Sequence, residues 1–208
     1  MKVAAALVAA VLLVGLGGWL FFSRSAAAPE DPRAGAARLM NELMSGKVPV
    51  GGPFTLTDSS GASRSLAEFR GKVVLLYFGF MSCPDICPTD LLAIGKALES
   101  VGAQADQVQP VFITLDPERD KPAALRAYVA SFHPRFVALT GSESEVRRVA
   151  TAYKVFYEKV PLPGTSTYTI DHAAFTFLLN RDGKYTGLFP PGTPVERMAV
   201  MLREQLQR

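Results

Sequence analysis

Between residues 53 and 208, apolar positions switch repeatedly between the spacing of strands and that of helices. Uninterrupted apolar runs at 73–78 and 108–115 predict buried strands, and helical spacing predicts a helix from near Pro88 to Gly102. The same signals predict a hairpin at 54–57 with its turn at 58–61, helices at 65–69, 120–132, 142–153 and 193–206, and strands at 136–139, 155–160, 168–179 and 184–189. This alternation predicts an α/β sandwich with a central sheet covered on both faces.

A different pattern fills the N-terminus, where residues 3–22 carry no charge. A helix of that length covers roughly the 30 Å hydrocarbon core of a bilayer, whereas a cleavable signal has an apolar region of only about 7 to 15 residues. We therefore expect an uncleaved transmembrane helix, with cleavage after the small residues 26–28 as the alternative. Lys2 precedes the run and acidic residues soon offset Arg24, so the positive-inside rule places the globular part outside the cytoplasm.

The segment that follows is rich in Ala, Pro and Gly, a composition typical of a tether. Start and stop signals between residues 31 and 46 predict one short helix inside it. We therefore divide the chain into a membrane anchor at 1–22, a linker at 23–52 and a globular domain at 53–208.

Composition excludes some classes of protein. The chain has 22 Lys and Arg against 19 Asp and Glu. A nucleic-acid-binding domain carries a clear basic excess, so we expect no nucleic acid as a partner. Two cysteines are too few for a disulfide-stapled scaffold, and a chain that is 49% hydrophobic does not need one.

Both cysteines lie at one corner, between the apolar run 73–78 and the helix that follows it. Cys83 and Cys87 are separated by three residues, so in a helical turn they are close enough to share a metal ion or to form a disulfide. The neighbouring helix N-terminus favours thiolate over thiol. We therefore predict a reactive site at the carboxyl end of a central strand, where ligands bind in open α/β sheets.

The chain offers two histidines as a further ligand. His172 follows Asp171 in an apolar strand pattern, and we predict that it joins the two cysteines. His133 precedes a proline at a helix end, where its charge suits the helix dipole, and we expect no ligand role for it. Two thiolates and one imidazole suit soft or borderline metals. Because structural zinc takes four protein ligands, we prefer one copper ion per chain.

Several neighbouring residues have weaker assignments. Asp85, between the cysteines, is interpreted as an exposed turn carboxylate, with tuning of the thiolate potential or contact with a partner as the alternatives. Asp171 is expected to orient His172 or to meet the partner. Met81 is expected to pack beneath the loop rather than to bind metal. Asp120 is interpreted as the cap of the helix that follows it.

Three segments together resemble the Sco/SenC family of copper proteins: 83–88 (CPDICP), 116–120 (DPERD) and 171–172 (DH). A CxxxC segment followed some 85 residues later by Asp-His is a specific signature. The resemblance extends over about residues 52–207, which is essentially the whole globular domain.

The resemblance implies a thioredoxin-like fold and copper bound by Cys83, Cys87 and His172. It also implies a role in assembling the CuA centre of cytochrome c oxidase, with subunit II or another copper donor or acceptor protein as the partner. The location implied is the inner membrane, with the domain on the periplasmic side.

The residues themselves leave other functions open. A thiol-disulfide oxidoreductase would use Cys83 and Cys87 on a partner's cysteines, although enzymes of that fold typically carry CxxC rather than CxxxC. Whether the protein is an enzyme therefore stays open. A purely structural disulfide would leave His172 without a role.

Overall fold

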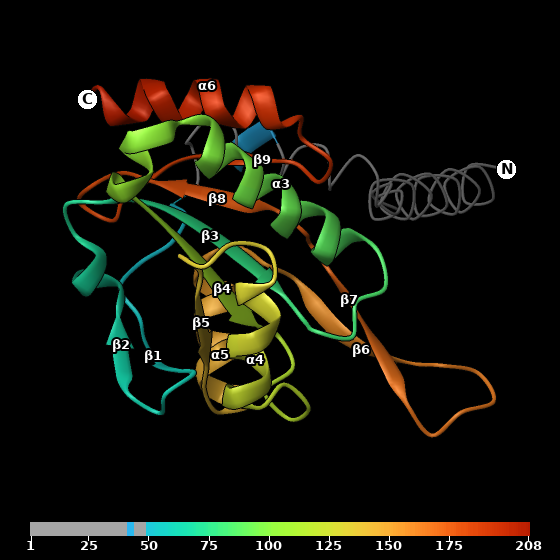
Figure 1. Ribbon diagram of the computed structural model, residues 1–208. Coiled ribbons are helices and arrows are strands. Elements are labelled where there is room, and N and C mark those ends of the chain that lie inside the picture. Colours follow the sequence, from blue (N-terminus) through green and yellow to red (C-terminus); the bar gives the residue numbers. More distant parts are fainter. Residues whose placement is uncertain (1–40, 44–48) are drawn as a thin grey trace, which may run out of the picture. The chain divides into compact units, whose positions relative to one another are not determined.

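The centre of the sheet is β3 (Val73–Gly79), in which every residue is buried. β3 pairs in parallel with β4 (Val108–Thr114), which is also buried throughout, and antiparallel with β8 (Thr176–Leu179). Strands that are apolar on both faces need cover on both sides. The computed structural model describes residues 41–43 and 49–208, and Figure 1 shows β3 in the middle of this part.

Seven strands form the main sheet, in the order β2-β1-β5-β4-β3-β8-β9. Its remaining members are β1 (Thr55–Asp58), β2 (Ser63–Ser65), β5 (Val137–Thr140) and β9 (Tyr185–Phe189). The pairs β3-β4 and β4-β5 are parallel, and the outer pairs are antiparallel. The mixed sheet with flanking helices confirms the predicted α/β sandwich.

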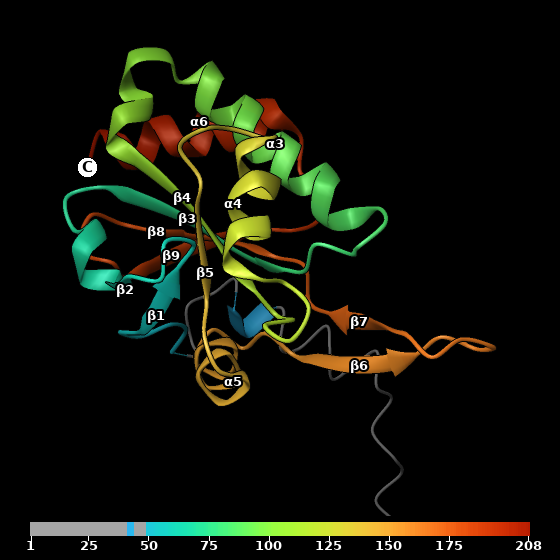
Figure 2. The ribbon, with the colours of Figure 1, turned by 60° about the horizontal axis from the view of Figure 1, so that its bottom comes forward.

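The helices divide between the two faces of the sheet. Within residues 49–208 they are α3 (Ile86–Ser100), α4 (Pro122–Ala130), α5 (Glu143–Ala152) and α6 (Val195–Leu206), together with the 3-10 turns η1 (Leu66–Phe69) and η2 (Gly102–Gln107). In Figure 2, α3, α4 and α6 lie on one face and α5 on the other. α5, predicted at 142–153, begins with a capping box of Ser142 and Glu145. α6 begins without a side-chain cap, and the hydroxyl of Thr193, just before it, donates to the carbonyl of Pro190 (2.6 Å).

The main departure from the predicted pattern is the segment 168–179, which we expected to be one strand. It is two strands in two different sheets: β7 (Tyr168–His172) and then β8. Among the described strands, β7 pairs only with β6 (Tyr157–Pro161). This two-stranded ribbon with its tip at 162–167, here called the arm, projects from the main sheet (Figure 1). The apolar run hides the break, because the same residue types suit either sheet.

Aromatic side chains fill the core behind the site. Phe78, Tyr153 and Phe177 pack against one another with ring centroids 5.5–5.9 Å apart. Tyr77 and Phe80 are also buried. This packing fixes β3 against β8 and so gives the cysteine corner a rigid base.

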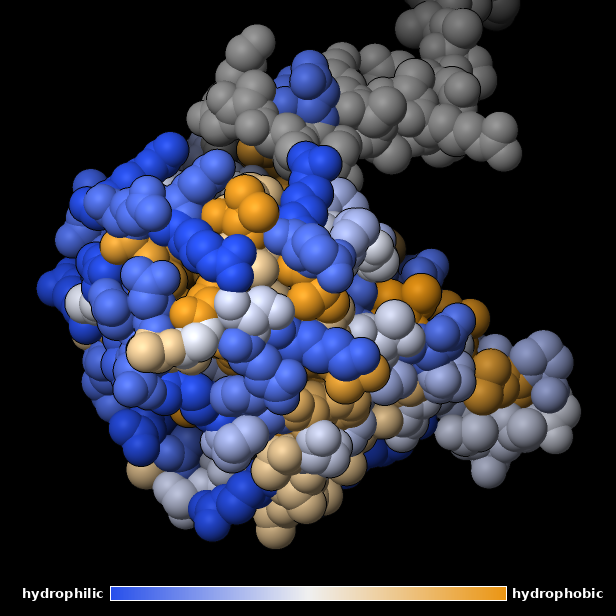
Figure 3. Space-filling model, turned by 45° about the horizontal axis from the view of Figure 1, so that its top comes forward, coloured by the Kyte–Doolittle hydropathy of each residue, from blue (hydrophilic) through white to orange (hydrophobic). Residues whose placement is uncertain are grey.

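The surface is polar over most of the face shown in Figure 3, with hydrophobic residues in separate patches. The large apolar side chains that are exposed are Ile86, Leu92, Phe156, Val160, Leu162 and Val200. Single exposed apolar residues are normal on a folded protein.

The predicted anchor at 1–22 and most of the linker at 23–52 lie outside the described residues. Within the described part of the chain, no helix is long and apolar enough to cross a membrane. The compact unit that contains the sheet comprises Leu43–Arg208.

Candidate functional site

The two cysteines lie where β3 turns into α3. The helix begins at Ile86, earlier than the expected start near Pro88, so that Cys87 is its second residue. Cys83 is half-exposed and Cys87 is buried, and both thiols are free. The backbone N–H of Cys87 points at Cys83 Sγ (3.4 Å). The sulfur thereby meets one of the first-turn N–H groups that have no partner inside the helix.

His172 reaches this corner from the last position of β7. Its Nε2 lies 3.4 Å from Sγ of Cys87, although 85 positions separate the two residues. The ring packs edge-on against Phe80, with centroids 5.8 Å apart, and its buried Nδ1 has no hydrogen-bond partner. The fold thus brings together the three residues that the sequence singled out.

The side chains of Cys83, Cys87 and His172 do not form a ready-made metal site in this structure. Among residues 41–43 and 49–208, no three or more His, Cys, Asp and Glu side chains are already set as a metal site. A metal ion bound by Cys83, Cys87 and His172 would therefore require the donors to adjust on binding.

The two thiols differ in their electrostatics. Hydrogen bonding from Cys87 is the main cause that lowers the pKa of Cys83, to about 3, with further help from His172 and from the backbone N–H groups of Cys87 and Asp85. The adjacent sulfur of Cys83, followed by burial, raises the pKa of Cys87. The corner therefore holds an outer thiolate, Cys83, next to an inner thiol, Cys87. The thiolate is the nucleophile of the pair, and both sulfurs are soft ligands.

A buried carboxyl group lies behind the inner thiol. The Tyr77 hydroxyl donates to Oδ2 of Asp90 (3.2 Å), and the N–H of Gly192 donates to Oδ1 (3.0 Å). Burial is the main cause that raises the pKa of both Tyr77 and Asp90. Asp90 was not predicted from the sequence, although its position three residues after Cys87 in a helix places it on the same side.

Asp120 corrects another expectation, because it is not the cap of α4. The N-cap position belongs to Lys121, and Asp120 is buried. Its Oδ2 accepts hydrogen bonds from the backbone N–H of Met81 (3.0 Å) and from the hydroxyl of Thr114 (2.7 Å). Asp120 thus fixes the start of the cysteine loop, the segment 80–85 between β3 and α3, by accepting the backbone N–H of Met81.

Asp85 and Asp171 are both exposed. Asp85 occupies the N-cap position of α3 without a side-chain cap, and Asp171 lies opposite Glu158 across the arm. Because Nδ1 of His172 has no partner, Asp171 does not orient the ring through that nitrogen. Its expected contact with a partner protein stays a prediction.

The second histidine lies elsewhere. His133 follows α4, beside Gly95 in the middle of α3. Its Nδ1 accepts the backbone N–H of Arg135 (3.2 Å). This local role at a helix end accounts for His133 without a ligand.

Comparison with known proteins gives consistent matches. The SCO1/SenC family profile matches residues 43–207. A SCO2-like protein of Rickettsia prowazekii is 41% identical over 175 residues, which cover 84% of this chain and 83% of that protein. Copper-bound ScoI of Bradyrhizobium japonicum superposes with a TM-score of 0.70 at 40% identity and covers 75% of this chain and 99% of that chain.

A third match is the solved structure of BsSco. BsSco is described as a member of the Sco family of cytochrome c oxidase assembly proteins with a disulfide switch. It superposes with a TM-score of 0.59 at 25% identity, over 77% of this chain and 96% of that chain.

Proposed function

This chain belongs to the SCO1/SenC family, and from that premise we propose that it is a metallochaperone which binds one copper ion through Cys83, Cys87 and His172. The observation that carries the proposal is the 3.4 Å approach of His172 Nε2 to Cys87 Sγ. Thiolates and imidazole suit soft or borderline metals. The copper-bound state of the Bradyrhizobium japonicum relative supports copper as that metal.

Copper is the cargo of this protein, and we propose that the acceptor is the CuA centre in subunit II of cytochrome c oxidase. The description of BsSco as a member of a family of cytochrome c oxidase assembly proteins supports this acceptor. Cys83 is half-exposed whereas Cys87 is buried, so an acceptor ligand would approach from the side of Cys83. Asp85 and Asp171 are exposed carboxylates on the two segments that carry the donors, and they would meet that partner.

Copper affinity tests the ligand set. The full chain in detergent is loaded with Cu(I) under anaerobic conditions and titrated with a competing chelator, and so are its His172→Ala and His133→Ala variants. We expect His172→Ala to lose about tenfold or more in affinity, since a ligand matters at least as much as the groups that support ligands. We expect His133→Ala to bind as tightly as the wild type. Equal affinities for all three proteins would remove His172 from the site.

We also propose that residues 1–22 anchor the protein in the inner membrane with the domain on the periplasmic side. Support comes from the uncharged run at 3–22, which is long enough to span a bilayer. In a Gram-negative host, the chain should stay with membranes after a carbonate wash, and protease added to spheroplasts should digest the domain. Recovery of the full-length chain in the soluble fraction would contradict the anchor.

The lowered pKa of Cys83 favours a second candidate, reduction of a partner's disulfide. The Cys83 thiolate would attack the disulfide and release one partner sulfur as a thiolate, which takes a proton from solvent. Cys87 would then lose its proton to the second partner sulfur and resolve the mixed disulfide. The partner gains two electrons and two protons, one from solvent and one from Cys87, while Cys83 and Cys87 become a disulfide. Turnover of a disulfide substrate by the copper-free protein with a thiol reductant tests this candidate. No turnover above that of Cys83→Ser would reject it.

A further inference from the structure

Two arginine side chains hold the arm that carries His172 against the rest of the domain, here called the body. Each guanidinium stacks on a tyrosine ring of the arm and donates a hydrogen bond to the carbonyl of the same tyrosine. We propose that Arg119 and Arg147 are positioning residues, which set the place of His172 against the cysteines by clamping one strand of the arm each. This inference deepens the proposed function and rests on His172 being a copper ligand. Neither arginine belongs to the predicted ligand set.

The first clamp acts on β7. The guanidinium of Arg119 lies 3.8 Å from the ring centroid of Tyr168, and its Nη1 donates to the carbonyl of the same residue (2.8 Å). Tyr168 opens β7, which ends four residues later at His172. The Tyr168 hydroxyl donates to Oδ1 of Asp116 (2.9 Å), and Nε of Arg119 donates to the other oxygen of this buried carboxylate. One tyrosine is thus held at its ring, its carbonyl and its hydroxyl.

The second clamp acts on β6. The guanidinium of Arg147, on α5, lies 3.7 Å from the ring centroid of Tyr157, and its Nη1 donates to the carbonyl of Tyr157 (2.9 Å). Tyr157 is buried and is the cross-strand partner of His172. Directly opposed residues of an antiparallel pair project from the same face and contact each other. Holding Tyr157 therefore restricts the position next to the imidazole.

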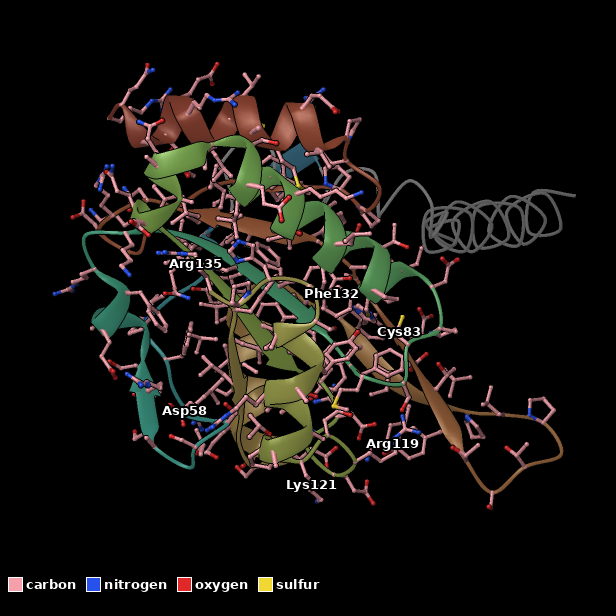
Figure 4. The ribbon with its side chains drawn as sticks, viewed as in Figure 1. Asp58, Cys83, Arg119, Lys121, Phe132 and Arg135 are labelled. Atoms are coloured by element: carbon pink, nitrogen blue, oxygen red, sulfur yellow. The ribbon has the colours of Figure 1, made fainter. Side chains whose placement is uncertain are left out.

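Two separate parts of the body provide these arginines. Arg119 follows β4 in the loop that also contains Asp120, and Asp120 binds the N–H of Met81 at the start of the cysteine loop. Figure 4 shows Arg119 on the same side of the molecule as Cys83, between the body and the arm. The loop 116–120 therefore contacts both the thiol-bearing and the histidine-bearing segments.

The need for such clamps follows from the topology. In the part of the chain that the structure describes, β6 and β7 pair only with each other, and a two-stranded ribbon is marginally stable by itself. Residues 158–161 of β6 are exposed, so burial contributes little along most of that strand. A guanidinium that stacks on an aromatic ring and donates to a carbonyl fixes both distance and orientation. The imidazole, whose Nδ1 lacks a partner, depends on the arm for its placement.

The test combines a direct measurement on the copper-free protein with a double-mutant cycle. In NMR spectra of the full chain in detergent, the nuclear Overhauser contacts between the His172 and Phe80 rings report the position of the imidazole. We expect these contacts to weaken in Arg119→Leu and in Arg147→Leu. Cu(I) affinity should fall by about tenfold in each variant, the lower end of losses for groups that support metal ligands.

In the His172→Ala background, the same two substitutions should leave Cu(I) affinity unchanged, because the residue through which they act is gone. Arg181→Leu is the matched control, since its guanidinium also binds backbone carbonyls, those of Gly71 and Leu206, but none in the arm. Arg181→Leu should leave both readouts unchanged.

Two results would overturn the proposal. The first is that the nuclear Overhauser contacts between the rings of His172 and Phe80 keep their wild-type intensity in both arginine variants. The other is an equal loss of affinity with and without His172, which would indicate a general effect on folding. If His172→Ala itself left affinity unchanged, the proposed ligand set would fail, whereas the NMR measurement would still decide whether the arginines position the ring.

Discussion

Gly79 faces the sulfur of Cys87 so closely that a methyl group on Gly79 would lie 3.0 Å from it. The same methyl group would lie 2.9 Å from the ring of Tyr77 and 3.1 Å from that of Phe112. All three neighbours are buried. A glycine at the end of β3 is therefore what allows the helix start and its inner thiol to pack against the sheet.

We expect Gly79→Ala to lower the free energy of unfolding by about 1–3 kcal/mol, the usual cost of an extra carbon in a packed core. Because Cys87 must shift, Cu(I) affinity should fall as well. Denaturant unfolding and chelator competition measure the two effects. The control is Gly187→Ala in β9, where the nearest atom to a new methyl group, Met201 Cε, is 3.9 Å away. Similar stability of both variants would contradict the prediction.

Gly95, in the middle of α3, should also resist substitution. Alanine normally stabilises a helix interior by about 1 kcal/mol relative to glycine. Here a Cβ atom would lie 2.7 Å from the backbone oxygen of Phe132, which cannot move as a side chain does. We therefore expect Gly95→Ala to destabilise the protein by about 1–3 kcal/mol. A midpoint of thermal unfolding equal to or above that of the wild type would show that α3 and the end of α4 separate easily.

Cys83 should react as a thiolate even in acid. Because its pKa is lowered to about 3, the thiolate dominates throughout the range from pH 5 to 8. The rate of alkylation of Cys83 in the copper-free protein, followed by peptide mass spectrometry, should therefore change little across that range, while buried Cys87 stays unmodified. In Cys87→Ala the first cause of the low pKa is gone, so the rate should rise with pH. A rate that climbs to pH 9 in the wild type would contradict this assignment.

Asp58 should make the stability of the protein depend on pH. Its carboxylate accepts hydrogen bonds from the hydroxyl and the N–H of Ser60, from Arg64 Nε and from the N–H of Ala62. The Ser60 hydroxyl is the main cause that lowers the pKa of Asp58. The folded protein thus binds this proton less readily than the unfolded chain, whose Asp pKa is about 3.9. The stabilisation is present above that value and is lost as pH falls towards the folded pKa.

We expect Asp58→Asn to cost about 1–3 kcal/mol at pH 7, and the difference from the wild type to shrink towards pH 3. Urea unfolding at both pH values measures it. Asp106→Asn is the control, because the side chain of Asp106 is 83% exposed and its ion pair with Arg135 lies on the surface. If the free energies of unfolding of Asp58→Asn and the wild type differed by the same amount at pH 7 and pH 3, the charge of Asp58 would not be the source of the stabilisation.

The sequence predicts most of the sheet because β3 and β4 are apolar at every position, a pattern that a buried parallel strand requires. The site was predictable for a different reason. Two cysteines at one corner and only two histidines in the chain leave few combinations. Residue chemistry and this scarcity identified His172 before its distance to Cys87 was known.

What local pattern could not show is which strands pair. The run 168–179 suits one strand or two, and tertiary pairing alone separates β7 from β8. The clamps escape prediction because Arg119 and Tyr168 lie 49 positions apart. The contact between Gly79 and Cys87 gives no signal either, since a glycine before a turn reads as part of the turn.

The tip of the arm also makes the protein easy to modify. Since β6 and β7 pair with no other strand of the described residues, extra residues at the tip, 162–167, would lengthen a solvent-exposed loop without shifting the register of the main sheet. A fluorescent label placed there would travel with the imidazole yet leave the thiols untouched. The tip thus offers a reporter position for motion of the histidine during metal exchange.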